Sequence, residues 1–253
     1  MFQEPRPTQF DLCFKIAGIP VRVHPLFWLV CIILGSMSGT PLGIAIWTGA
    51  VFVSILIHEL GHAVVMRWYG ETPRISLYFG GGLAISDGPK SWGSGGKFGR
   101  TTSEQVIISF AGPAAGFILA GVIVGLVFLN GGKVELSGIL MVPMFEFQLN
   151  ENLRLLIFYL LLINTFWGLM NLIPVYPLDG GQISRALFTH ANPSDGVRQS
   201  LWVSVVAGAL AAFAGIVVFK MFFIAILFGM LAFSSFQALQ MMDRGGFGGG
   251  NPW

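Results

Sequence analysis

From Leu201 to Met242 the chain is a nearly continuous apolar run that contains a single charged residue, Lys220. As one helix this run would be about 63 Å long, because an α-helix rises about 1.5 Å per residue. The hydrocarbon core of a bilayer is about 30 Å thick, so the run has the length of two membrane spans. We therefore predict that it folds back on itself, with the turn at Lys220.

The composition extends this conclusion to the whole chain. Of its 253 residues, 54% are hydrophobic and 10% are charged, whereas a soluble domain carries about 25% Asp, Glu, Lys and Arg. An ordinary soluble domain is therefore excluded. The formal net charge is only +2, and the basic residues are scattered over loops rather than gathered on one face, which excludes nucleic-acid binding.

The apolar sequence divides into six predicted membrane helices, over residues 25–37, 41–69, 103–129, 153–173, 199–219 and 221–242. The first is short for a full span, and the second is long enough to tilt. At the start of the third helix, Thr101 and Glu104 fit a capping box, in which each residue satisfies a backbone N–H of the other.

Alternating apolar and polar residues predict two short β segments at the membrane surface, near residues 10–23 and 75–86. The first is expected to be a hairpin around Ala17 and Gly18. The predicted fold class is therefore an all-α polytopic membrane protein with small surface β segments. We expect residues 1–253 to form a single membrane-embedded domain.

The basic residues between the predicted helices indicate an orientation. Cytoplasmic loops carry an excess of Lys and Arg, and with the N-terminus inside only Lys133, Arg154 and Lys220 remain outside. We therefore expect both termini in the cytoplasm and the protein in a plasma membrane. The stretch up to Val23 lacks the apolar core of a signal peptide, so the first helix is expected to act as an uncleaved insertion signal.

Three polar residues, His58, Glu59 and His62, lie inside the second predicted helix in the order HELGH. Residues four apart share one face of a helix, so the two imidazoles can bind a single metal ion. Glu59 is displaced around the helix, where it can act on a water molecule as a general base without binding the metal. Lipid penalises a charged carboxylate by at least about 2.5 kcal/mol, so Glu59 should face a protein interior or a water-filled cavity. The alternative to a metal site is a pair of packing histidines hydrogen-bonded to Glu59.

A catalytic zinc ion usually has three protein ligands, so a third must come from another segment. Asp179 is the best candidate, because Pro174, Pro177 and Gly180 around it break the cytoplasmic end of the fourth predicted helix. His58 lies toward the same side of the membrane, so the two depths are compatible. The alternative is a simple turn with an Asp cap.

HELGH in a membrane helix, followed far downstream by NLIPVYPLDGG, resembles the site-2 protease family of intramembrane zinc metallopeptidases. The segments GIPVRVHPLFWL, LYFGGGLAI and AGPAAG resemble the layout of the same family, so the likeness covers most of the chain. The resemblance implies a six-helix core in which His58, His62 and Asp179 bind one zinc ion and Glu59 activates water. It also implies that Asn171 helps to position the substrate or a reaction intermediate.

The chain departs from many relatives in several places. Gly116 stands where they carry Asn, so Gly112, Gly116 and Ala120 are expected to form a ridge of small residues for close helix packing. No PDZ insertion fits in residues 131–150 and no CBS domain follows Met242, which predicts a minimal form of the family.

The second β segment contains Gly80, Gly81 and Gly82, which we assign to substrate binding or intermediate stabilisation. A helical substrate must unwind to expose its carbonyls, and an unwound peptide can pair with Ile75–Ser86 as an added strand. A purely structural hairpin at the membrane surface explains the segment equally well.

Other polar residues point to simpler roles. His24 and His190 have no metal-like partner in the sequence and are expected on the surface, His190 in a loop after Asp179. Arg185 is expected to be a cytoplasmic anchor, although it could pair with a substrate carbonyl or a lipid headgroup.

The sequence therefore predicts an intramembrane zinc metalloprotease with one zinc ion per chain. Its expected substrates, by resemblance, are membrane-anchored proteins such as anti-sigma factors or signal-peptide remnants, cut within or near the bilayer. The competing class is non-enzymatic: a metal carrier, or a silent relative that binds membrane segments without cutting them. The presence of Glu59 argues against the silent relative, which could dispense with this residue.

Overall fold

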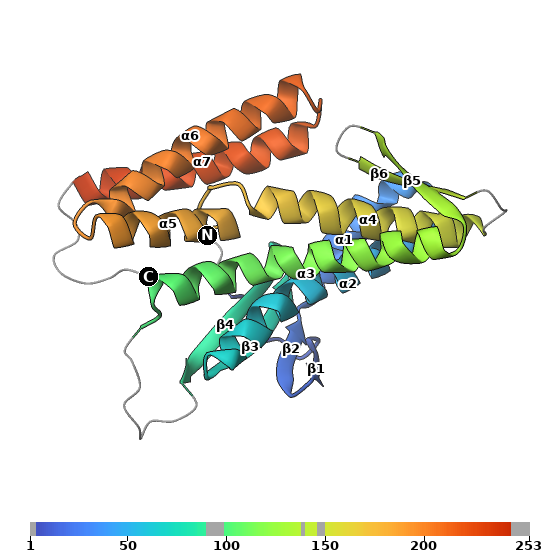
Figure 1. The fold of residues 1–253 in the computed structure, drawn as a ribbon, viewed down its shortest axis with the longest axis horizontal. Helices are drawn as coiled ribbons and strands as arrows, with labels where there is room; N and C mark the ends of the chain where they lie inside the picture. The colour runs from blue at the N-terminus through green and yellow to red at the C-terminus, as the bar shows by residue number, and fades with distance from the viewer. Residues whose placement is uncertain (1–3, 90–98, 138–139, 146–149, 244–253) are drawn as a thin grey trace. The chain divides into compact units, whose positions relative to one another are not determined.

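The computed structural model describes residues 4–89, 99–137, 140–145 and 150–243 (Figure 1). The chain divides into two compact units. The first takes its residues from 1–98 and 111–170, and the second from 99–110 and 171–253. That residues 1–253 act as a single domain stays a prediction.

Within the described residues, five helices are long and apolar enough to cross a membrane (Figure 1). They are α2 (Pro41–Trp68), α3 (Thr102–Leu129), α4 (Glu151–Asn171), α6 (Gly196–Val217) and α7 (Phe222–Asp243). The first predicted span is a shorter helix, α1 (Pro25–Gly35), followed by a 3-10 turn over Ser36–Ser38. The mostly helical fold is therefore confirmed, and a sixth full span is not.

Helices α6 and α7 run side by side and form the fold-back expected from their apolar run (Figure 1). The turn between them contains Lys220 in a left-handed conformation, with φ of 52°. The backbone N–H of Met221 donates to the carbonyl of Gly215 at 2.8 Å and closes this turn. Gly208 allows the close approach, since a Cβ there would lie 3.0 Å from the Cβ of Ala232.

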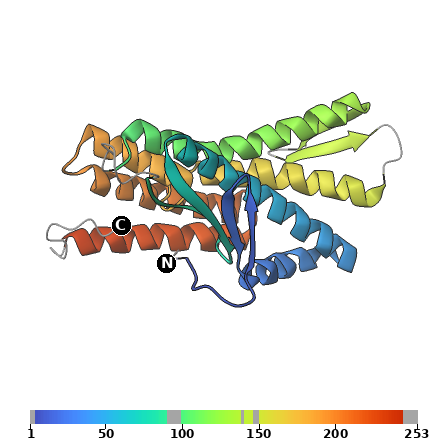
Figure 2. The ribbon, with the colours of Figure 1, turned by 90° about the horizontal axis from the view of Figure 1, so that it is seen from below.

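Four strands of the first unit form one sheet in the order β1-β2-β3-β4. Figure 2 shows the hairpin of β1 (Leu12–Ile16) and β2 (Ile19–Val23), in dark blue, beside the hairpin of β3 (Glu71–Tyr78) and β4 (Gly81–Pro89), in teal. Strands β2 and β3 are parallel, whereas the other two pairings are antiparallel. Both predicted β segments are thus confirmed.

The turns of the two hairpins contain the residues that the sequence indicates. Ala17 and Gly18, with φ of 49° and 80°, connect β1 to β2. Phe79 and Gly80 form the turn between β3 and β4, and Gly81 follows with φ of 111°. Only glycine adopts that last conformation without strain.

A separate antiparallel hairpin, β5 (Gly132–Ser137) and β6 (Leu140–Phe145), follows α3. The sequence predicts no secondary structure for this segment. Residues 138–139 and 146–149 of the segment lie outside the described part of the chain.

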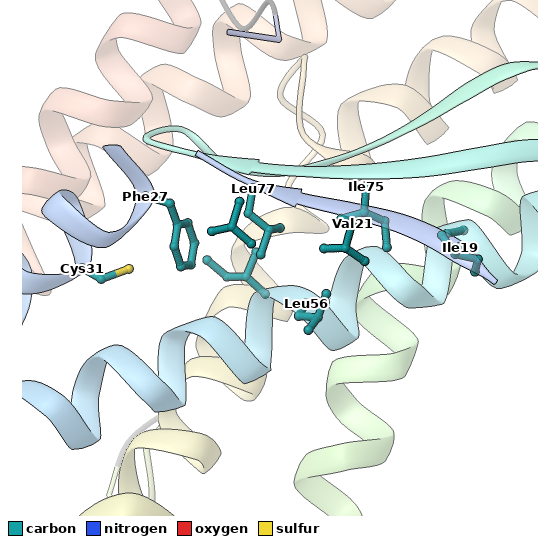
Figure 3. Packing of buried hydrophobic residues seen from close by; sticks show 10 residues of the cluster. Ile19, Val21, Phe27, Cys31, Leu56, Ile75 and Leu77 are labelled. Carbon is teal, nitrogen blue, oxygen red and sulfur yellow. The ribbon is translucent and has the colours of Figure 1, made fainter. Parts of the chain in front are cut away.

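A hydrophobic core joins the sheet to α1 and α2. Val21, Ile75 and Leu77 on the strands belong to one cluster with Leu56 on α2, and Phe27 of α1 lies at the Leu77 end of this cluster (Figure 3). Because Leu56 lies two residues before the HELGH sequence, this core fixes the sheet beside the candidate metal-binding segment.

Two histidine predictions are wrong. His24 is buried, at 8% exposure, rather than on the surface, and its Nδ1 accepts a hydrogen bond from the backbone N–H of Leu26 at 3.2 Å. It therefore caps α1, a role usually filled by Ser, Thr, Asp or Asn. His190 is exposed, as expected, but it lies in the last turn of a helix, α5 (Asp179–Ala191), and not in a loop. This helix is too short and too polar to register as a membrane span.

An ion-pair network ties the N-terminal segment to the sheet. Glu4 accepts hydrogen bonds from Arg22 and Arg74, each at 2.6 Å. Arg22 also pairs with Asp11 at 3.0 Å, and Arg74 with Asp87 at 2.8 Å. Partial burial raises the pKa of Glu4, but the hydrogen bonds and charges of Arg74 and Arg22 outweigh it, so the pKa lies below its ordinary value.

We expect the substitution Glu4→Gln to lower the free energy of unfolding by about 1 kcal/mol or less at neutral pH, the usual size of an ion-pair contribution near a surface. A carboxyl whose pKa is lowered by folding stabilises the protein above its ordinary pKa, and this contribution is lost as the pH falls through the folded-state value. The difference should therefore disappear at acidic pH. Thermal unfolding in detergent at both pH values measures it. Glu135→Gln, on an exposed residue of β5, is the control, and an equal difference at both pH values would contradict the prediction.

Candidate metal centre

Two imidazoles of α2 lie side by side inside the first unit. His58 and His62 are 5% and 6% exposed, and their Nε2 atoms are 3.2 Å apart. Two nitrogens that bind one tetrahedral zinc ion at about 2.0–2.1 Å are separated by about 3.3 Å. A hydrogen bond between the rings would have a similar length, and two buried imidazoles with adjacent Nε2 atoms also form a donor set that fits a metal ion.

Glu59 lies beside strand β4. It is 6% exposed, and a Cβ built at Gly82 would come within 3.0 Å of its side chain, including Oε1. Real Cβ atoms essentially never approach so closely, so any larger residue at this position would displace the Glu59 side chain. The charge of Glu59 also reaches Tyr78, whose pKa is raised first by burial and then by this carboxylate.

Gly112 of α3 provides the space that the imidazoles occupy. A Cβ at this position would lie 2.8 Å from Nε2 of His58 and closer still to the ring of His62. One turn later, Gly116 packs against Asn164 of α4, with 3.4 Å from its built Cβ to the amide oxygen. Ala120 is buried at 3% exposure. The predicted ridge of small residues therefore exists, and its first member borders the candidate ligands.

Ser54, one turn before His58 on α2, forms a buried polar pair with Asn164 of α4. The sequence does not predict this pair. Asn164 donates from Nδ2 to Oγ of Ser54 at 2.8 Å, and both residues are 3% exposed. Ser54, His58 and His62 recur every four residues and so share one face of α2. The signal that could have found the pair is this spacing, together with a lone Asn in the middle of an apolar helix.

The other two predicted site residues belong to the second unit. Asn171 is the last residue of α4 and Asp179 is the first residue of α5, and each is 8% exposed. Pro174 and Pro177 lie between them and end α4, as the sequence indicates. Their roles toward the histidines stay predictions.

The glycines after Asp179 let α5 pack onto its own incoming turn. A Cβ at Gly180 would come within 3.0 Å of the Leu172 carbonyl, and one at Gly181 within 3.0 Å of the Tyr176 backbone. The N–H of Leu178 donates to the carbonyl of Val175 at 2.9 Å and tightens the same turn. This packing holds Asp179 at the start of the helix.

The three glycines predicted for substrate binding occupy different surroundings. Gly82 lies against Glu59, as described above. Gly81 faces Trp167 of α4, whose ring is 3.5 Å from a built Cβ. Gly80 lies in the turn of the β3–β4 hairpin.

Comparison with known proteins connects this site to a family. A model described as peptidase family M50 matches residues 47–213. A zinc metalloprotease of Methanocaldococcus jannaschii is 35% identical over 179 residues, which are 70% of this chain and 44% of that protein. Stage IV sporulation protein FB of Bacillus subtilis is 25% identical over 185 residues, which are 72% of this chain and 51% of that protein. The chain thus spans about half the length of the curated relatives it matches.

A solved structure gives the same result over a larger share of the chain. The site-2 protease from Methanocaldococcus jannaschii is similar with a TM-score of 0.59 and 26% identity, covering 91% of this chain and 95% of that one. The fold and the HExxH helix define a multi-pass membrane protein of the metallopeptidase type. The chain belongs to peptidase family M50.

Proposed function

We propose that this protein is an intramembrane zinc metalloprotease that hydrolyses peptide bonds of membrane-anchored proteins. The observation that carries the proposal is the pair of buried imidazoles on a membrane helix, whose Nε2 atoms are 3.2 Å apart. Glu59 directly follows the first of these histidines in the sequence. Membership in peptidase family M50 and the relatives named as zinc metalloproteases support it.

His58, His62 and Asp179 would hold one zinc ion. Two imidazoles alone leave a zinc site one protein ligand short of the usual three. Asp179 supplies a carboxylate from a buried position held by the turn before α5.

Glu59 would serve as the general base and then as the general acid. When bound, zinc lowers the pKa of water toward neutrality and polarises the scissile carbonyl. Glu59 accepts a proton from the attacking water and later delivers it to the leaving amine. The neighbouring strand at Gly82 restricts the carboxylate to a small region, which favours the orientation that proton transfer needs.

The substrate would bind as a strand beside β4. Among the described strands, β4 is at the edge of its sheet, and its Gly82 lies next to Glu59. An unwound segment paired along β4 would therefore pass the catalytic carboxylate. Gly80 and Gly81 would admit its backbone, and Asn171 would hold the substrate or an intermediate. Candidate substrates are anti-sigma factors and signal-peptide remnants.

The membrane arrangement that we propose keeps six spans in one domain. Helix α1 and its 3-10 turn, Pro25–Ser38, are shorter than the five long helices. A short apolar helix can cross where the bilayer is locally thinned. Six spans place both termini on the same side, which the distribution of basic residues indicates is the cytoplasm, and the host membrane would be the plasma membrane.

Proteoliposomes that contain the full chain and a library of single-span peptides test the proposal. We expect zinc-dependent products cut within or near the apolar segment, identified by mass spectrometry, that vanish with a chelator and return with added zinc. Retention of zinc without cleavage of any peptide would favour a silent relative or a metal carrier instead.

Gly112→Ala should disturb the metal site, because the added methyl group would occupy the space of the imidazoles. We expect zinc retention and activity to fall at least about tenfold, which is the usual effect of disturbing the residues that position metal ligands. Gly125→Ala on the same helix is the matched control, since nothing lies within 4 Å of its Cβ position. That change should leave zinc binding intact and stabilise α3 by up to about 1 kcal/mol. Equal zinc retention by the two variants would show that Gly112 does not limit the ligand geometry.

A further inference from the structure

The second unit contains a cavity of about 740 Å³ that the proteolytic mechanism does not use. It is bounded by the start of α3, one face of α5 and the start of α6. Its polar lining includes Arg100, Thr101, Tyr176, Arg185, Thr189 and His190. The cavity therefore gathers basic groups and hydroxyls from three elements that are far apart in the sequence.

One face of α5 forms a wall of this cavity. Gln182, Arg185 and Thr189 recur at intervals of three and four residues, so their side chains share that face. Nε2 of Gln105 on α3 donates to Oε1 of Gln182 at 3.1 Å and joins the two walls. The wall thus continues from α5 to the first turn of α3.

The lining is positively charged. Two guanidinium groups line the cavity, and no lining residue is acidic. No ion pair joins Arg185 to a carboxylate within the described residues; its guanidinium lies over the Tyr176 ring, 5.5 Å from the centroid. A cation–π contact holds the group without neutralising it.

The cavity lies where membrane helices end. Helix α3 begins at Thr102 and α6 at Gly196, and both helices are candidate spans. Span ends meet the headgroup region, where phosphate groups of lipids are concentrated. Arginine binds phosphate through paired N–H donors, and basic cavities between membrane helices accommodate anionic headgroups. We infer that this cavity binds the phosphate group of an anionic phospholipid.

Lipid retention by the full-length protein tests this inference. The protein is released from nanodiscs of phosphatidylcholine doped with phosphatidylglycerol, and the bound lipids are counted by native mass spectrometry. We expect one phosphatidylglycerol to be retained in preference to phosphatidylcholine. Arg185→Gln should weaken retention about tenfold, the loss expected for one charge-assisted contact. Arg185→Lys should restore part of the affinity, because it restores the charge.

Arg198→Gln is the matched control. Arg198 lies near the start of α6, pairs with Asp243 at 3.3 Å and does not line the cavity. Equal loss in the Arg185 and Arg198 variants, or no loss in either, would overturn the inference. A parallel titration with inorganic phosphate separates the two sources of the anion. If free phosphate binds and the lipid does not, the phosphate chemistry is supported and the lipid source is wrong.

Discussion

Replacing Glu59 with Gln is expected to slow cleavage of a membrane-anchored peptide by about 10²- to 10⁴-fold, the usual contribution of a general acid–base group. The Gln side chain has nearly the same shape and fits the same narrow space beside Gly82. It cannot accept the proton of the attacking water at neutral pH. Zinc retention should be unchanged, because Glu59 is proposed as a base and not as a ligand.

Two measurements on the same preparation test this result. The cleavage rate in proteoliposomes reports the chemistry, and elemental analysis reports the zinc content per chain. Glu151→Gln, at an exposed position at the start of α4, is the control and should keep both values. Cleavage that survives Glu59→Gln would show that another group is the base. Loss of zinc in the same variant would show that Glu59 is a ligand.

Replacing Asp179 with Ala is expected to weaken zinc retention at least about tenfold and to remove activity with it. Loss of a supporting residue alone typically costs 10- to 100-fold in metal affinity, and a direct ligand should cost no less. Competition with a chromogenic chelator measures the affinity. Asp195→Ala, at an exposed position just before α6 in the same unit, is the control. Unchanged zinc affinity would assign the third ligand to another residue.

Several features of the fold could be predicted from the sequence because local chemistry determines them. The capping box at Thr101 and Glu104 is present, with the Thr101 hydroxyl accepting from the Glu104 N–H at 3.3 Å. The turn at Lys220 follows from a length argument, since one helix of that length would exceed the bilayer. The alternation of apolar and polar residues around Ala17 and Gly18 is sufficient to predict the β1–β2 hairpin.

Other features were beyond these local rules. Helix α5 is polar and only 13 residues long, so hydropathy did not separate it from a loop. The burial of His24 could not be predicted, because it accompanies a backbone contact with Leu77, which follows it by more than fifty residues. The N–H of His24 donates to the Leu77 carbonyl at 2.8 Å, a contact that depends on parallel pairing of β2 and β3.

The sequence by itself determined which polar groups the candidate site contains. The spacing of His58 and His62 places both imidazoles on one helix face wherever that helix lies, because the period of an α-helix is a property of the backbone. Only the tertiary structure decided what surrounds them. The sequence predicts a substrate-binding role for Gly82 and a helix-packing role for Gly112, and the fold makes them the positions where a strand meets Glu59 and a helix meets the imidazoles. The physical reason is that close approach depends on the positions of two elements at once, whereas residue spacing depends on one.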